Sequence, residues 1–402
     1  MNAKCLKALL IALLICFGWS IAWSAQSPFP ANATFATLTT TPLAIEGLTG
    51  DNSGNLYTVG RNAGNGVPCP VWEINIANPL LVIVGNIPAP SSTTQCAPLG
   101  LAFNAAGDLF VADGNRISFL TPNAVTRPTA SVYATGVPGT NGVAFDHDGN
   151  LWTGDGGTGL GRVWKITAPG ANCATADRCE EVFRIQPMNN GSALGGLSSG
   201  VGRVNSTIQP PQTPEAPNNP QNAVANGLAF NAQGNLLVAD TARGALWLVT
   251  FDKSGNLVSK LGCDATFSSN TLCLENLFRA DPRLEGVDGI ALDISGDIWA
   301  SVNERNAIVF TVFFGTSDSV EVFRNPVNSS GLRNSATDNT RILEFPTSPF
   351  LSGTKFCTAN SDNNRRDNSP SNAGEIGGAG ADLGKISCMD QALGTSGLPL
   401  PR

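Results

Sequence analysis

Four oxygen-bearing side chains recur at one position of a repeated pattern and could together bind a metal ion. The position stands directly before a glycine, and a second glycine follows seven residues after the first. The five copies of the pattern carry, in order, Glu46, Leu99, Asn141, Asn226 and Asp288. Carboxylate and amide oxygens suit Ca²⁺, which takes roughly six to eight oxygen ligands. The sequence therefore predicts a Ca²⁺ site, or a site for another divalent cation, formed by Glu46, Asn141, Asn226 and Asp288.

A second interpretation of the same residues needs no metal. Asn-Gly and Asp-Gly pairs are also favoured turn residues. On that reading the pairs would only shape the chain locally. Turn chemistry does not explain Glu46, because glutamate is a poor turn residue.

The elements that must position these residues follow from the pattern itself. An apolar stretch runs into a turn of Asp or Asn and Gly, and a second apolar stretch leaves it, as in a β-hairpin. Two further strand-like stretches follow each copy, so that each unit has four strands. Such a repeat predicts an all-β, six-bladed β-propeller over residues 43–395, with the first strand of every blade along the central channel.

The sixth blade has to be assembled from both ends of the chain. Residues 341–345, 354–362 and 385–389 look like three strands, and the N-terminal lead, residues 25–42, can supply the fourth. In the fourth unit, residues 257–262 are the predicted outer strand. Residues 187–225 are polar and aperiodic, which predicts a surface insertion. A hidden blade in that stretch would make a seven-bladed ring.

The termini and cysteines indicate an exported protein. Lys4 and Lys7 precede an apolar run at residues 8–17, so residues 1–24 are typical of a signal peptide, with no stable membrane anchor after cleavage. The predicted location is secreted or periplasmic. Eight cysteines follow this segment, and their positions predict the disulfides Cys69–Cys96, Cys173–Cys179, Cys263–Cys273 and Cys357–Cys388.

Composition excludes several kinds of site. The net charge of −7 argues against binding to nucleic acid, which requires a basic surface. The chain has one histidine, His147, in a hairpin turn at the far end of an inner strand. A zinc site and a Ser-His-Asp mechanism are therefore not expected.

The residues before the glycines resemble those of a known family. Glu46-Gly47, Asn141-Gly142, Asn226-Gly227 and Asp288-Gly289 look like the family of regucalcin (senescence marker protein 30), gluconolactonases and diisopropyl fluorophosphatase, with paraoxonases more distant. The resemblance implies a six-bladed propeller that holds a divalent cation in its channel. It also implies that Asp288 is a metal ligand and the general base or nucleophile. Residues 109–120 and 236–249 further resemble NHL repeats, which are binding modules of the same architecture.

Arginines near the predicted metal site could bind substrate. The loops after the second strand of each blade return to the face that bears the metal, and they carry Arg61, Arg243 and Arg305. A guanidinium is suited to an anionic or carbonyl-bearing substrate. Each arginine could instead be solvated or pair with a neighbouring blade.

The sequence thus favours an exported, metal-dependent hydrolase of the lactonase or esterase type. Ca²⁺ would polarise the carbonyl of a small-molecule substrate, and the protein would act as a monomer. The alternative is a non-catalytic, NHL-like propeller that binds a ligand or a protein partner. A strictosidine-synthase-like enzyme is a third reading, which would need Glu46 or Glu304 as its base.

Overall fold

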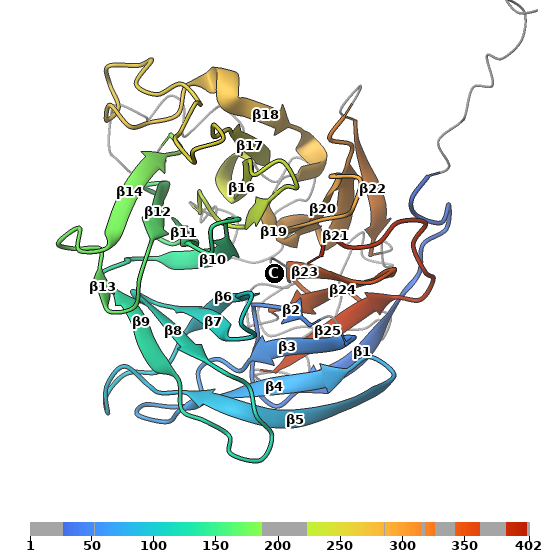
Figure 1. The fold of residues 1–402 in the computed structure, drawn as a ribbon. Helices are drawn as coiled ribbons and strands as arrows, with labels where there is room; N and C mark the ends of the chain where they lie inside the picture. The colour runs from blue at the N-terminus through green and yellow to red at the C-terminus, as the bar shows by residue number, and fades with distance from the viewer. Residues whose placement is uncertain are drawn as a thin grey trace, which may run out of the picture.

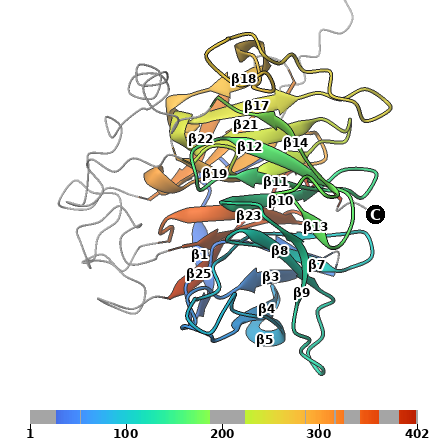
Figure 2. The same ribbon diagram turned by 90° about the vertical axis from the view of Figure 1, so that its left-hand side faces the viewer.

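Six antiparallel sheets form a closed ring around a central channel (Figure 1). The computed structural model describes residues 27–51, 53–186, 223–284, 286–314, 318–325, 342–361 and 383–399. Each sheet is a blade of four strands, and the inner strand of each blade lies along the channel. Seen from the side, strands of successive blades stack above one another (Figure 2). The predicted six-bladed β-propeller is confirmed.

The first three blades follow the chain in order. Blade 1 consists of β2 (Thr49–Gly50), β3 (Asn55–Val59), β4 (Cys69–Asn75) and β5 (Asn78–Ile87). Blade 2 consists of β6 (Pro98–Phe103), β7 (Leu109–Asp113), β8 (Arg116–Leu120) and β9 (Ser131–Thr135), and β13 (Ala171–Asn172) adds a short parallel edge. Blade 3 consists of β10 (Thr140–Phe145), β11 (Leu151–Asp155), β12 (Arg162–Ile166) and β14 (Cys179–Arg184).

In the other three blades, the described connections include four short 3₁₀ helices. Blade 4 consists of β15 (Leu228–Phe230), β16 (Leu236–Asp240), β17 (Ala245–Val249) and β18 (Leu277–Ala280). Blade 5 consists of β19 (Val287–Leu292), β20 (Ile298–Val302), β21 (Ala307–Thr311) and β22 (Ser319–Arg324). Blade 6 consists of β23 (Pro346–Ser352), β24 (Lys355–Asn360), β25 (Gly384–Met389) and β1 (Phe35–Thr41). The 3₁₀ helices are η2 (Thr241–Arg243), η3 (Leu274–Asn276), η4 (Pro282–Leu284) and η5 (Asn303–Arg305).

The N-terminal strand closes the ring, as the sequence predicts. β1 pairs with β25 in antiparallel register from Phe35 opposite Met389 to Thr41 opposite Gly384. This pairing satisfies the backbone groups of a strand that would otherwise be an open edge.

Hydrophobic clusters hold the blades together, one at each of the six contacts between neighbours. Blades 3 and 4 share the cluster that contains Trp152, Phe183 and Trp247, all of them buried. These two blades therefore pack directly against each other. The seven-bladed alternative is wrong, because no room remains for a blade between them.

The hairpin turns confirm the predicted turn chemistry. In blade 3 the Asp146 side chain accepts hydrogen bonds from the backbone of Asp148 and Asn150, and Gly149 has a φ of 80°. The same geometry recurs at Asp51, Asn104, Asn231 and Asp293. A positive φ explains why the second glycine of each copy is fixed.

The first glycine of each copy has a different role. A Cβ atom on Gly142 would lie 2.2 Å from the carbonyl oxygen of Asn226 in the next blade, which is too close for any side chain. Gly47, Gly100, Gly227 and Gly289 show the same approach to the following blade. None of these glycines has a positive φ. The interpretation of the Asn-Gly and Asp-Gly pairs as turn residues is therefore wrong: the pairs stand at the start of the inner strands.

Two predicted strands lie elsewhere. The inner strand of blade 6 is β23, not residues 341–345, because Phe345 has a left-handed φ of 53° that breaks the extended chain. Side-chain amides bind the backbone before it, as when Asn306 accepts from the Phe345 amide at 2.8 Å. In blade 4 the outer strand is β18, and residues 257–262 form only isolated bridges.

All four predicted disulfides are present: Cys69–Cys96, Cys173–Cys179, Cys263–Cys273 and Cys357–Cys388. The last joins neighbouring positions of β24 and β25 in the closing blade. Within the described ranges, no helix has the length and apolar character needed to cross a lipid bilayer. The predicted signal peptide, residues 1–24, and residues 187–222 of the predicted insertion lie outside the described residues.

Candidate metal and catalytic site

Six equivalent residues encircle the channel at one mouth, one at the start of each inner strand. We call them the ring: Glu46, Leu99, Asn141, Asn226, Asp288 and Thr347. In five of the six blades the ring residue follows one that pairs with the end of the second strand, as Thr140 pairs with Asp155 in blade 3. The carbonyl oxygens of five of them rest against the first glycine of the preceding blade. The structure thus brings Glu46, Asn141, Asn226 and Asp288 to equivalent places around one axis.

Thr347 completes the ring, and the sequence pattern does not reveal it. Its Oγ1 donates a hydrogen bond of 2.6 Å to the carbonyl oxygen of Glu46, which joins the last blade to the first. Blade 6 has Ser348 where the other copies have glycine. Its turn glycine, Gly353, also comes two residues earlier than the pattern requires. The sequence feature that could still have revealed Thr347 was its place before an apolar stretch and a glycine.

The residue that follows the second strand orients the ring side chain of the same blade. Asn303 donates to Asp288 Oδ2 at 3.0 Å. The Asn226 amide donates to Thr241 Oγ1 at 2.8 Å. Neither contact follows from the repeat pattern alone.

In blades 1 and 3, the residue after the second strand contacts the ring residue in other ways. Arg61 forms an ion pair with Glu46 in blade 1. In blade 3 the position is Gly156, whose missing side chain leaves room for Asn141: a Cβ atom there would lie 2.7 Å from the Asn141 Cβ.

One ring atom lacks a partner within the described residues. Asn226 is 2% exposed, and its Oδ1 accepts no hydrogen bond there, while its nitrogen is held by Thr241. A buried acceptor without a partner costs free energy and calls for an explanation. A cation bound to this oxygen would satisfy it.

The ring chemistry fits a hard cation bound by mixed oxygens. Glu46 and Asp288 supply two carboxylates, and the guanidinium of Arg61 offsets the charge of Glu46. The described residues contain no group of three or more His, Cys, Asp or Glu side chains that could hold a metal. Any cation here would therefore depend on the Asn141 and Asn226 amide oxygens as well, which suits Ca²⁺ better than zinc.

The three predicted substrate arginines all form ion pairs. Arg61 contacts the ring itself through Glu46. Arg243 binds Asp240 at 2.8 Å and the carbonyl oxygen of Gln186 at 2.7 Å. The same Asp–Arg arrangement recurs as Asp113–Arg116 and Asp155–Arg162.

Arg305 is buried, as Arg243 is, and it forms an ion pair with a residue of the outer strand of its own blade. It is 5% exposed and binds Glu321 at 2.9 Å, and its Nε and Nη1 have no hydrogen-bond partner within the described ranges. The role of the three arginines in substrate binding stays a prediction, and Arg61 is the one in contact with a ring residue.

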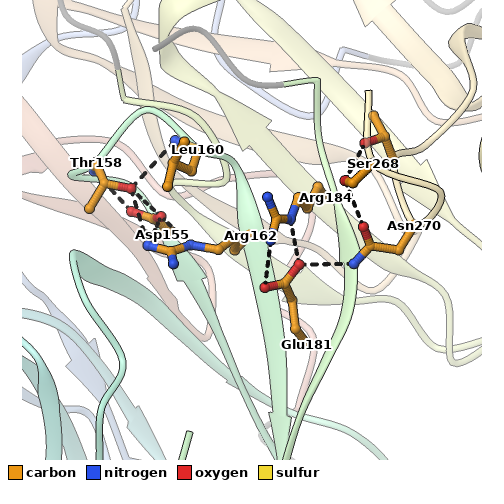
Figure 3. A network of polar contacts seen from close by, with 9 residues as sticks. Asp155, Thr158, Leu160, Arg162, Glu181, Arg184, Ser268 and Asn270 are labelled. Atoms are coloured by element: carbon orange, nitrogen blue, oxygen red, sulfur yellow. Dashed lines mark hydrogen bonds and ion pairs between the residues drawn. The ribbon is translucent and has the colours of Figure 1, made fainter. Parts of the chain in front are cut away.

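Figure 3 shows the polar contacts of the Asp–Arg pair in blade 3, Asp155 and Arg162. Asp155 accepts hydrogen bonds from the Thr158 amide and from Arg162 Nε, each at 2.9 Å, and also from the Thr158 hydroxyl. Asp155 is fully buried. The arrangement anchors the loop after β11, next to Asn141.

Glu181 carries a second network toward blade 4, also drawn in Figure 3. Asn270 donates to Glu181 Oε1 at 2.9 Å, and Arg184 donates to Glu181 Oε2 at 3.0 Å. Burial alone would raise the pKa of the Glu181 carboxyl, but the hydrogen bonds from Arg184 and Asn270 outweigh it and lower the pKa. The ionised carboxylate therefore stabilises the contact between blades 3 and 4.

The network predicts a pH-dependent loss of stability in the variant Glu181→Gln. Because the pKa is lower in the folded state, the contribution is present above the ordinary glutamate pKa of about 4.3 and is lost as pH falls through the folded value. We expect Glu181→Gln to lower the free energy of unfolding by about 1 kcal/mol at pH 7. The difference from the wild type should shrink below about pH 4. Urea unfolding at a series of pH values measures it, with the exposed neighbour Glu180→Gln as control. An equal loss in both variants would contradict the assignment.

A buried ion pair that the sequence did not reveal lies in blade 6. Lys385 Nζ is 3.0 Å from Glu344 Oε2, and both side chains are at most 5% exposed. Asn360 accepts a hydrogen bond from the Glu344 amide at 2.9 Å, three residues before Thr347. His147, as predicted, is an exposed turn residue at the other end of an inner strand. The side chain of Glu304 lies outside what the structure describes.

Comparison with known proteins supports the fold. No family model matches the chain, and no curated protein matches it in sequence. The solved structure of a luciferin-regenerating enzyme is 13% identical, with a TM-score of 0.53 over 92% of this chain and 99% of that one. Regucalcin from Agrobacterium tumefaciens, described as a calcium-binding protein, is 15% identical, with a TM-score of 0.52 over 93% and 98%. The chain shares the propeller fold of these two proteins.

A third similar structure has a different activity. The PQQ-bound aldose sugar dehydrogenase from Streptomyces coelicolor is 14% identical, with a TM-score of 0.52 over 90% of this chain and 99% of that one. At such identities the likeness establishes the fold and not the reaction. The predicted resemblance is therefore confirmed for the architecture, and the chemistry has to be argued from the ring.

Proposed function

We propose that the protein is a metal-dependent hydrolase of the lactonase or esterase type. The observation that carries the proposal is the ring, in which carboxylate and amide oxygens occupy equivalent positions and Asn226 Oδ1 is buried without a partner among the described residues. Glu46, Asn141, Asn226 and Asp288 would hold the cation, with Ca²⁺ preferred. The calcium-binding regucalcin of the same fold supports this choice.

The ring residues and the residues that contact them would have different roles in hydrolysis. A bound divalent cation would supply Lewis acidity toward a carbonyl oxygen. Asn303 fixes the orientation of the Asp288 carboxylate. Asp288 would take a proton from the water that attacks the carbonyl carbon and return it to the leaving oxygen as the C–O bond breaks. Arg61 would offset the charge of Glu46 and, with Arg243 and Arg305, is the proposed contact for polar substrate groups.

Location and assembly belong to the same proposal. Four disulfides are typical of an oxidising compartment, which supports secretion or a periplasmic location. We propose that the protein acts as a monomer on a small-molecule substrate and does not bind nucleic acid. A non-catalytic binding propeller is the second candidate, because Arg61 already neutralises Glu46 and a cation could then serve only to pin the blades.

Metal content and hydrolysis of the purified protein test the proposal together. We expect a bound divalent cation near one equivalent, and hydrolysis of some lactones or esters that a chelator abolishes and added Ca²⁺ restores. Calcium at about 100 times its Kd should stabilise the fold by about 2.7 kcal/mol, measured by thermal unfolding. Tight calcium binding without any hydrolysis would favour the binding propeller. A protein that binds no divalent cation would overturn both.

A matched pair of variants distinguishes an effect on cation binding at the ring from an effect on general stability. Asn226→Leu removes the oxygen without a partner, and leucine is tolerated at this position because Leu99 occupies it in blade 2. Leu99→Met is the control, since it removes no oxygen. We expect at least a tenfold loss of calcium affinity in Asn226→Leu and no change in Leu99→Met, measured by calorimetry.

A further inference from the structure

An apolar chamber lies in the channel behind the ring. Its volume is about 230 Å³, and it begins at Gly100, Gly142, Gly227 and Gly289, each of which directly follows a ring residue. It ends at the opposite mouth, beside the hairpin turns that hold His147 and Asn231. The chamber therefore extends from behind the ring to the opposite mouth, and its lining does not include the proposed metal ligands.

Successive levels of the inner strands explain why the chamber exists. Just behind the glycines, the strands carry Leu48, Leu101, Val143, Leu228, Ile290 and Pro349. The next level is alanine in four of the six blades, namely Ala102, Ala144, Ala229 and Ala291. The level beyond it includes Phe103, Phe145, Phe230, Leu292 and Leu351. Small residues between two levels of large ones leave the space open, and Thr49 is the one polar side chain in these three levels.

The C-terminal segment forms the floor of the chamber. Blade 6 is complete without it, yet residues 396–399 continue beneath blades 5 and 6. The Leu398 amide donates to the carbonyl of Leu292 at 2.8 Å, and the Gly397 amide donates to that of Gly353 at 3.0 Å. Gly397, Leu398 and Pro399 line the chamber. In Figure 1 this segment, in red, runs to the middle of the ring.

Asn231 and His147 form a polar corner of the chamber. Asn231 is 1% exposed, and its Nδ2 has no hydrogen-bond partner within the described residues, while its Oδ1 accepts from two backbone amides of its turn. His147 lies against the same turn, because a Cβ atom on Gly234 would be 3.3 Å from its Cδ2. The equivalent Asp146 and Asp293 each accept from a tryptophan indole, and the equivalent Asn104 donates to Asp108. Blade 4 has Leu237 where blades 3 and 5 have that tryptophan.

We propose that the chamber binds a compact, uncharged apolar molecule that carries one hydrogen-bond acceptor. Apolar walls disfavour water, and a cavity of about 150 Å³ lined by such residues is large enough for benzene. The volume here admits a substituted aromatic ring or an alicyclic molecule of about ten non-hydrogen atoms. Its apolar body would lie among the alanines, and its oxygen would accept from Asn231 Nδ2, which relieves the buried donor. A charged ligand is excluded by the cost of desolvation.

Acetophenone, ethylbenzene and benzoate are matched probes for this site. Acetophenone has the aromatic body and a carbonyl acceptor, ethylbenzene lacks the acceptor, and benzoate carries a charge. Binding to the purified wild-type protein can be measured by calorimetry and by ligand-detected NMR. We expect acetophenone to bind at least tenfold more tightly than benzoate. Failure of acetophenone to bind would overturn the proposal.

Two variants locate the binding in the chamber. Ala229→Leu fills the alanine level and should weaken acetophenone at least tenfold, whereas Ala77→Leu, at an exposed turn, should leave it unchanged. Asn231→Asp keeps the turn cap, as aspartate does in blades 1, 3 and 5, and removes the donor. It should weaken acetophenone at least fivefold and leave ethylbenzene unaffected. Unchanged binding in Ala229→Leu would refute the location, and equal losses of both probes in Asn231→Asp would refute the polar contact.

The chamber does not include Asp288, and the variant Asp288→Asn tests whether the site is independent of the proposed hydrolysis. It should retain wild-type affinity for acetophenone, because Asp288 is not part of the chamber wall. Loss of acetophenone binding in Asp288→Asn would contradict the separation of the two sites. Hydrolysis without acetophenone binding would overturn the chamber proposal alone, and binding without hydrolysis would overturn only the proposed reaction.

Discussion

A protein that lacks residues 27–41 is expected not to fold. The deletion removes β1 and leaves β25, whose six residues are all buried, as an unpaired edge. It also removes Phe35 from the cluster between blades 5 and 6, where its ring lies 4.8 Å from that of Phe323 and 5.9 Å from that of Phe356. An open, apolar edge favours aggregation. Soluble yield and circular dichroism measure the outcome.

Point variants make the same prediction testable in a folded protein. Phe35→Ala should lower the free energy of unfolding by about 3–5 kcal/mol, because it leaves a cavity in a buried cluster. Thr37→Ala, on the exposed face of the same strand, should change it by less than about 0.5 kcal/mol. Equal unfolding midpoints for the wild type and Phe35→Ala, or a deletion variant with the wild-type melting temperature, would show that β1 does not close the ring.

The repeated pattern predicted most of the fold because most of its residues are required by the local backbone conformation. The second glycine is needed at a positive φ, and the Asp or Asn before it caps the turn. Such requirements act within a few residues, so they can be read from one copy and checked against the others. The first glycine is required by a close contact between neighbouring blades. The sequence shows this requirement only as a glycine that recurs at the same position of each copy.

The sequence failed where tertiary contacts override the local pattern. Residues 341–345 are apolar enough for a strand, but side chains from two other segments, Asn306 and Asn325, bind their backbone. The outer strand of blade 4 lies beyond the Cys263–Cys273 loop, at residues that showed no repeat signal. Thr347 was missed for the same reason. Its role depends on its bond to Glu46, which lies 301 residues away in the sequence.

The candidate site could be predicted only as a set of positions. The sequence placed four oxygen donors at one repeat position, and the structure confirms that this position encircles the channel. The sequence did not reveal which residues orient these oxygen donors. Arg61, Thr241 and Asn303 have this role because they contact the ring residues where the first and second strands lie side by side. The chamber behind the ring was likewise not foreseen, since the alanines look like ordinary core residues.

The variant Asp288→Asn is expected to reduce turnover by about a hundredfold to ten-thousandfold while it retains the fold. The amide keeps an oxygen for a cation but cannot accept a proton, and general-base catalysis contributes roughly 10²–10⁴ in rate. The loss of a negative charge also weakens cation binding. Asn303, which donates to Asp288 Oδ2 at 3.0 Å, can still donate to an amide oxygen, so the local structure should survive. Hydrolysis rates at saturating Ca²⁺ measure the effect.

Two controls distinguish loss of the base from loss of the metal. Glu46→Gln should mainly weaken calcium binding and lower the melting temperature, and excess Ca²⁺ should restore much of its turnover. Asp288→Asn should remain inactive at any calcium concentration. If Asp288→Asn regained its rate in excess Ca²⁺, Asp288 would be a ligand only, and the proton would have to pass to another group on this face. Asp288 is buried and its Oδ2 accepts a hydrogen bond from Asn303, so the variant changes one carboxylate oxygen of a side chain that is already held in place.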